Sequence, residues 1–106
     1  MSVLIVTYDL NTPGQKYKCI MEYFSNVDWI RLSESCYAIE TDLHPEVVFK
    51  ELGACLDEND SLLVVTATKP FDGYGPKDAI NWLDQHLPPD PNDSDDTLSS
   101  HRFFGD

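Results

Sequence analysis

Residues 2–24 read SVLIVTYDLNTPGQKYKCIMEYF, and they join an apolar strand directly to an amphipathic helix. The consecutive apolar residues at 3–6 are mostly β-branched, which is typical of a strand that is covered on both faces. The run from Thr12 to Gln15 predicts a helix start, because Thr12 can cap and Pro13 suits the first helical position. The stripe expected to face the core then recurs at helical spacing: Tyr17, Ile20, Met21 and Phe24.

The same reading of periodicity and turn residues predicts more elements: strands at 27–33, 35–41 and 62–65, and helices beginning at Pro45 and Pro76. His44 stands at the cap position of the helix from Pro45. The resulting order predicts an α+β fold, a ferredoxin-like βαββαβ antiparallel sheet in the order 4-1-3-2 with an appended C-terminal helix. We expect this domain to span residues 1–87, and an acidic, proline-rich C-terminal tail to follow at 88–106.

Two helices can cover only one face of a four-stranded sheet. The strands at 2–9 and 62–65 are apolar on both faces, so the second face also needs a cover. A second copy of the chain would provide that cover, and this is the main sequence argument for a homodimer. The third helix and the tail are the rival explanations.

The chain is strongly acidic, with 19 acidic and 7 basic residues and a net charge of −12 over 106 residues. Residues 88–106 contribute −4, so residues 1–87 still carry −8. A surface this negative repels phosphate backbones, which disfavours non-specific binding of nucleic acid, and it suits divalent cations or a basic protein partner. No apolar run approaches the roughly 20 residues that span a bilayer, and no secretory leader is expected.

The three cysteines, Cys19, Cys36 and Cys55, are widely spaced along the chain. An odd number without a close pair argues against a disulfide framework and a zinc site. We therefore expect buried free thiols and a cytoplasmic location.

The predicted topology gathers hydroxyls and carboxylates at one end of the sheet: Asp9, Ser33, Glu34, Ser35 and Asp60. Mg²⁺ prefers oxygen ligands, so Asp9 is a candidate metal ligand and catalytic residue. The structural alternative is that Asp9 stabilises the chain turn and that Asp60 is a solvated loop residue.

The remaining polar residues of chemical interest are scattered. His44, His86 and His101 do not share metal-ligand spacing, so structural or surface roles are expected for them. A small basic and aromatic patch after the fourth strand is expected to pack locally rather than to stack a base; it consists of Lys69, Phe71, Tyr74 and Lys77. The tail is expected to be disordered, but Phe103-Phe104 offers an alternative, since this pair could dock in a groove or add a strand to a sheet edge.

Several motifs resemble those of the bacterial SinR family of small ferredoxin-like proteins, which is distinct from the helix-turn-helix repressor of that name. They are Thr7-Tyr8-Asp9-Leu10 followed by Pro13-Gly14 and Tyr17, Trp29 leading to Leu32-Ser33-Glu34-Ser35, Thr41-Asp42-Leu43, Asp60-Ser61-Leu62-Leu63-Val64, and Gly73-Tyr74-Gly75. The resemblance covers about residues 2–87. The SinR family in turn is similar to the family of the small CRISPR-associated adaptation subunit. Members of that family are homodimers, and some of them are metal-dependent nucleases.

The resemblance implies that Asp9 matches the aspartate proposed to hold a metal near the dimer axis. It also implies homodimerisation, sometimes with a C-terminal segment added to the partner's sheet, a role that residues 101–104 could fill. The acidity of this chain departs from the basic, DNA-contacting surfaces of adaptation subunits.

Two hypotheses follow. In the first, the chain is a non-catalytic homodimeric interaction module, with a basic protein as a further partner. In the second, it is a Mg²⁺-dependent nuclease acting on RNA or DNA, with Asp9 as the magnesium ligand.

Overall fold

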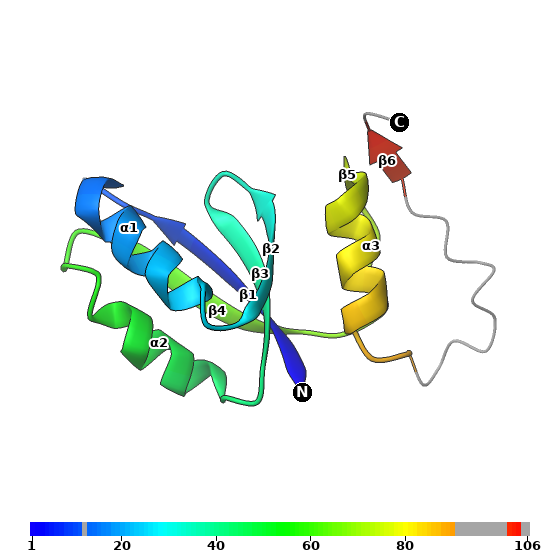
Figure 1. The fold of residues 1–106 in the computed structure, drawn as a ribbon, viewed down its shortest axis with the longest axis horizontal. Coiled ribbons are helices and arrows are strands. Elements are labelled where there is room, and N and C mark those ends of the chain that lie inside the picture. Colours follow the sequence, from blue (N-terminus) through cyan, green and yellow to red (C-terminus); the bar gives the residue numbers. More distant parts are fainter. Residues whose placement is uncertain (12, 91–101, 105–106) are drawn as a thin grey trace.

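A computed structural model describes residues 1–11, 13–90 and 102–104. The expected capping role of Thr12 and the stretches 91–101 and 105–106 of the tail lie outside the described residues. Two layers of helix enclose one central sheet (Figure 1). Among the described residues, no helix is both long and apolar enough to cross a bilayer.

The central sheet has four strands, namely β1 (Ser2–Asp9), β2 (Asp28–Ser33), β3 (Cys36–Thr41) and β4 (Ser61–Ala67). Their order is β2-β3-β1-β4, and all three neighbouring pairs are antiparallel. The predicted α+β class and the four-stranded antiparallel sheet are therefore confirmed. The order is the expected list 4-1-3-2 read from the opposite edge.

Helices α1 (Pro13–Phe24) and α2 (Pro45–Gly53) lie together on one face of this sheet (Figure 1). The His44 imidazole accepts a hydrogen bond from the Glu46 backbone N–H at 3.0 Å, which confirms the predicted cap. The buried core between the helices and the sheet consists of Leu4, Val6, Tyr8, Ile20, Phe24, Tyr37, Ile39, Val48 and Leu52.

The second face of the sheet is partly covered by α3 (Lys77–His86), the predicted third helix. Val3, Ala38 and Leu87 form a buried cluster there, with Trp82 and Leu83 packed against it. One chain thus shields part of this face itself, so the rival to the homodimer explanation is correct over this part of the sheet.

The loop predicted between strand four and the third helix contains a short strand, β5 (Tyr74–Pro76). It pairs in parallel with β6 (Arg102–Phe104), and Gly75 lies opposite Phe103. The C-terminal segment with Phe103 and Phe104 therefore pairs with β5 of its own chain, in a two-stranded sheet separate from the central one. Pairing with a partner's sheet stays a prediction.

The prediction of three free thiols is wrong, because Cys19 and Cys55 form a disulfide. These residues are 36 positions apart, but Cys19 lies on α1 and Cys55 follows the end of α2, and the two helices share one face of the sheet. Spacing along the sequence does not reveal a pair made by tertiary packing. Cys36 is free and only partly buried, and burial raises the pKa of its thiol.

Candidate functional site

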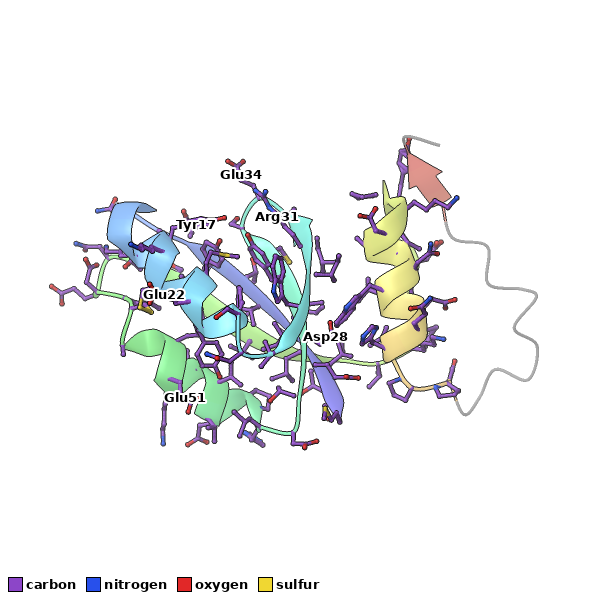
Figure 2. All side chains as sticks on the ribbon, in the orientation of Figure 1. Tyr17, Glu22, Asp28, Arg31, Glu34 and Glu51 are labelled. Carbon is purple, nitrogen blue, oxygen red and sulfur yellow. A yellow bond between two sulfur atoms is a disulfide. The ribbon has the colours of Figure 1, made fainter. Side chains whose placement is uncertain are left out.

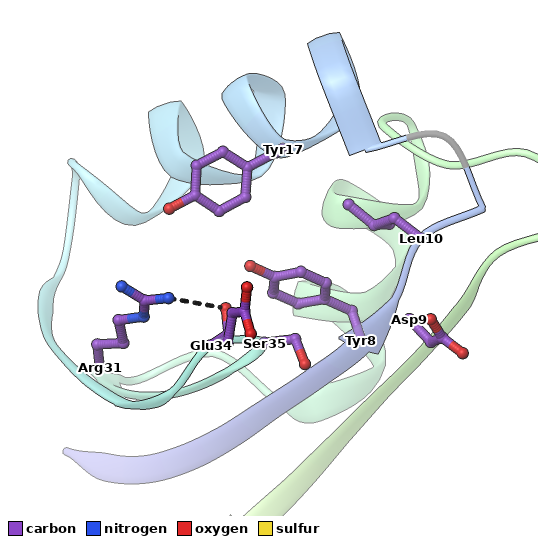
Figure 3. Close-up of a pocket in the computed structure, with 7 residues that line it drawn as sticks. All are labelled: Tyr8, Asp9, Leu10, Tyr17, Arg31, Glu34 and Ser35. Carbon is purple, nitrogen blue, oxygen red and sulfur yellow. Dashed lines mark hydrogen bonds between the residues drawn. The ribbon is translucent and has the colours of Figure 1, made fainter.

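A cavity of about 420 Å³ opens where β1 ends beside the β2–β3 hairpin (Figure 3). Strand β1, helix α1 and the hairpin all contribute to its wall, which is formed by Tyr8, Asp9, Leu10, Tyr17, Arg31, Glu34 and Ser35. The structure thus brings three of the predicted site residues, Asp9, Glu34 and Ser35, to one cavity. Ser33 lines a neighbouring hollow, with Tyr74 and Pro76.

Asp9 lies at the margin of this cavity and is exposed. Its carboxylate points away from Tyr8, toward the other side of β1 (Figure 3). This follows from strand alternation, which places Asp9 on the second face of the sheet with Thr7. Within the described residues, Asp9 does not belong to a group of three close metal-ligating side chains.

Asp60 is not part of this cavity. Its two carboxylate oxygens accept hydrogen bonds from the backbone N–H groups of Asn11 (2.8 Å) and Asp57 (2.9 Å), and Lys16 Nζ lies 2.9 Å from Oδ2. These hydrogen bonds, chiefly those from the two backbone groups, lower the pKa of Asp60 to about 2. Asp60 therefore joins three segments structurally, so it is neither a metal ligand beside Asp9 nor a merely solvated loop residue.

Two tyrosines, Tyr8 and Tyr17, line the cavity, and both contact the buried Tyr37. The Tyr17 and Tyr37 hydroxyls are 3.3 Å apart, and burial raises the pKa of Tyr37 well above its ordinary value. Tyr8 is 7% exposed, and its hydroxyl has no hydrogen-bond partner among the residues that the structure describes. This hydroxyl is buried beside Tyr37, and burial raises its pKa.

Arg31 adds the positive charge of the cavity. Its Nε donates to the Ser33 carbonyl at 3.1 Å, and a terminal nitrogen donates to the Glu34 carbonyl at 3.4 Å. Figure 2 shows Arg31 and Glu34 together at the hairpin end of the sheet. Neither Arg31 nor Tyr8 was predicted as a site residue from the sequence, and Tyr17 was expected to face the core. Their local sequence does not single them out, because the cavity forms only where β1, α1 and the β2–β3 hairpin meet.

A second candidate site is an apolar patch on the open part of the second face. We define the β4 patch as Leu63 and Val65, which are 60% and 45% exposed. Strand register places Leu63 beside Thr7 and Val65 beside Ile5, all on the face that α3 only partly covers. Asp9 follows in the same register, beside Ser61, so its carboxylate borders the β4 patch.

The predicted basic and aromatic patch packs into the molecule only in part, because Tyr74 is 63% exposed and Lys77 is exposed. Lys69 Nζ forms an ion pair with Asp84 at 3.2 Å, and Phe71 packs against the cluster beneath α3. Of the three histidines, His44 caps α2, His86 contacts Asp28 near the end of α3, and His101 lies outside the described residues.

A scan against protein-family models finds no match, and a search of curated proteins finds no relative.

Proposed function

We propose that this chain is a ferredoxin-like, non-catalytic interaction module that forms a homodimer through the β4 patch. The observation that carries the proposal is the pair of exposed apolar side chains, Leu63 and Val65, on the part of the second sheet face that α3 does not cover. Exposed apolar side chains that adjoin on one rigid face mark interaction surfaces more often than scattered ones do.

Charge favours a second copy as the occupant of this face. The chain carries −12, so two copies repel each other over most of their surfaces. On the β1 and β4 part of the second face, however, the outward residues from Ile5 to Thr7 and from Ser61 to Ala67 are uncharged, and Asp9 alone adds a carboxylate at the rim. Two copies can therefore meet here with little electrostatic cost.

The experiment is a mass measurement in solution by light scattering at micromolar concentration. We expect twice the chain mass of 12.0 kDa for the wild type and a single copy for Leu63→Lys with Val65→Lys. The matched control is Val47→Lys, because Val47 is also apolar and exposed (39%) but lies on α2. A wild type that stays at one copy would contradict the proposal.

A basic protein partner is a further part of the proposal, supported by the net charge of −12. Binding to such a partner should weaken steeply with added salt, because exposed charges are screened within about 10 Å at 0.1 M ionic strength.

A cytoplasmic location is also part of the proposal, but three free thiols no longer support it, because two of the cysteines form a disulfide. Thiol labelling of freshly lysed cells tests it, since an oxidised Cys19–Cys55 pair throughout the pool would contradict a reducing compartment.

The alternative function is a Mg²⁺-dependent nuclease of the kind that the SinR resemblance implies. One geometric observation favours it: the Asp9 carboxylate borders the β4 patch, so a twofold axis through that patch would bring two Asp9 side chains toward each other. Hydrolysis of RNA or DNA that requires Mg²⁺ and disappears in Asp9→Asn, with the dimer intact, would establish this function over the non-catalytic one.

A further inference from the structure

Three side chains from three elements converge at the other end of the sheet. Asp28 on β2, Glu40 on β3 and His86 at the end of α3 each offer one ligand atom, and these atoms all lie within 4.8 Å of one another. The register pairs Asp28 with Glu40, and Glu40 with Val3, six residues before Asp9 on β1. At about 3.3 Å per residue this cluster is about 20 Å from Asp9.

The orientation of the His86 ring is set by a backbone group. Its Nδ1 lies 2.8 Å from the Trp82 carbonyl, which can only accept, so Nδ1 carries a hydrogen. Nε2 is then the free nitrogen of the neutral ring, and it faces Asp28 Oδ2 at 2.8 Å. Two lone pairs cannot face each other at this distance, so in the metal-free chain a proton on Nε2 joins the two atoms as an ion pair, and a bound metal ion would take the place of that proton.

The surrounding groups are arranged as around a metal site. Metal-binding histidines commonly donate their second ring N–H to a carbonyl, and metal-binding carboxylates are themselves hydrogen-bonded. Here the Trp82 indole Nε1–H donates to Asp28 Oδ1 at 3.2 Å, which leaves Oδ2 for the ligand position. The Trp82 ring stacks on His86, with centroids 3.8 Å apart and planes 9° apart, and thereby fixes the imidazole.

The charge of the cluster also suits a divalent cation. Asp28 and Glu40 supply two carboxylates beside the imidazole of His86, and the ligand atoms of all three lie within 4.8 Å of one another. A proton on the imidazole leaves this group of three at −1, whereas a divalent ion bound to the neutral ring balances both carboxylates.

We propose that Asp28, Glu40 and His86 form a binding site for a borderline divalent transition-metal ion, with Zn²⁺ as its representative. An imidazole nitrogen with two carboxylates suits Zn²⁺ better than Mg²⁺, because Mg²⁺ prefers a shell of oxygens. Three protein ligands leave one tetrahedral position for water. The ion would tie the end of α3 to β2 and β3. This site is independent of Asp9 and of the β4 patch.

The test is calorimetric titration of metal-free full-length chain with ZnCl₂. We expect one Zn²⁺ per chain for the wild type and loss of this binding in Glu40→Gln and His86→Gln. Trp82→Phe keeps all three ligands but removes the indole N–H, so we expect roughly 10-fold weaker binding. The matched controls are Glu58→Gln, an exposed carboxylate elsewhere, and His44→Asn, which preserves the cap of α2.

Folding is checked separately by far-ultraviolet circular dichroism and by thermal unfolding without metal. Glu40→Gln is the decisive variant, because Glu40 acts on His86 through charge and not through a hydrogen bond, so the metal-free fold should survive. Zn²⁺ should raise the unfolding temperature of the wild type and leave that of Glu40→Gln unchanged. Absence of Zn²⁺ binding by the wild type, or equal binding by folded Glu40→Gln, would overturn the site.

Discussion

The two faces of the sheet differ in how completely they are closed. On the face covered by α1 and α2, Leu4, Ile20 and Phe24 are fully buried. On the face covered by α3, burial is complete only beneath the helix, and the side chain of Leu63 on β4 is 60% exposed. The same strands therefore contribute buried core residues on one face and exposed apolar side chains, available for an interaction, on the other.

The bonds that hold the helices in place also differ between the two faces. Helices α1 and α2 are joined by the Cys19–Cys55 disulfide and by the Tyr23 hydroxyl, which donates to Glu51 at 2.7 Å. Helix α3 is held at its end by polar contacts to Asp28, which an ion or a change of charge can strengthen or weaken. The closed face is thus fixed by packing and covalent bonds, and the open face by groups that respond to solution conditions.

The largest effect should come from the closed face. Phe24→Ala removes a fully buried ring that packs 4.9 Å from Tyr37, and we expect a loss of about 3–5 kcal/mol in the free energy of unfolding. Leu63→Ala, the matched change on the open face, should cost about 0.5 kcal/mol in the monomer. Urea unfolding measures both. Similar losses for the two variants would contradict the difference between the faces.

Removing the disulfide should have the next largest effect. Cys19 and Cys55 close a loop with a sequence separation of 36, so the pair Cys19→Ser and Cys55→Ser should lower the free energy of unfolding by roughly 4 kcal/mol. Urea unfolding of wild type and variant measures the loss. Cys36→Ser is the control because that thiol is free. If reductant leaves the wild-type transition unmoved, the disulfide does not contribute to stability.

The elements of this fold were predictable because each is encoded within a few residues. Consecutive apolar residues predicted β1, and His44 followed by Pro45 predicted the start of α2. The strand β5 was missed because Tyr74–Pro76 contains a glycine and a proline and gains its pairing only from residues 102–104.

The site was less predictable because its contacts join distant segments. Strand order was enough to bring Asp9 and Glu34 to one end of the sheet. Strand order did not show that the Asp60 carboxylate forms an ion pair with Lys16. It also did not show that His86 contacts Asp28, which is 58 positions away. Such contacts depend on side-chain direction and on the docking of α3, and neither has a local sequence pattern.

The smallest effect should come from the ion pair that fastens α1 to the turn before β4. The pKa of Asp60 is about 2 in the folded chain, below the value of 3.8 for a free Asp, so its contribution is full above about pH 5 and is largely lost as the pH falls to about 2. Asp60→Asn should therefore unfold at a lower temperature than the wild type at pH 7, and the pH-dependent part of the gap should close between about pH 5 and pH 2.

Thermal unfolding followed across this pH range measures the gap, with Asp9→Asn as the control that removes one carboxylate from the open face. The amide introduced by Asp60→Asn retains one oxygen for the N–H groups of Asn11 and Asp57, so part of the loss at neutral pH is a backbone hydrogen bond. The pH-dependent part belongs to the charge facing Lys16. A gap that stays constant down to pH 2 would show that the carboxylate acts on the closed face only through its hydrogen-bond geometry.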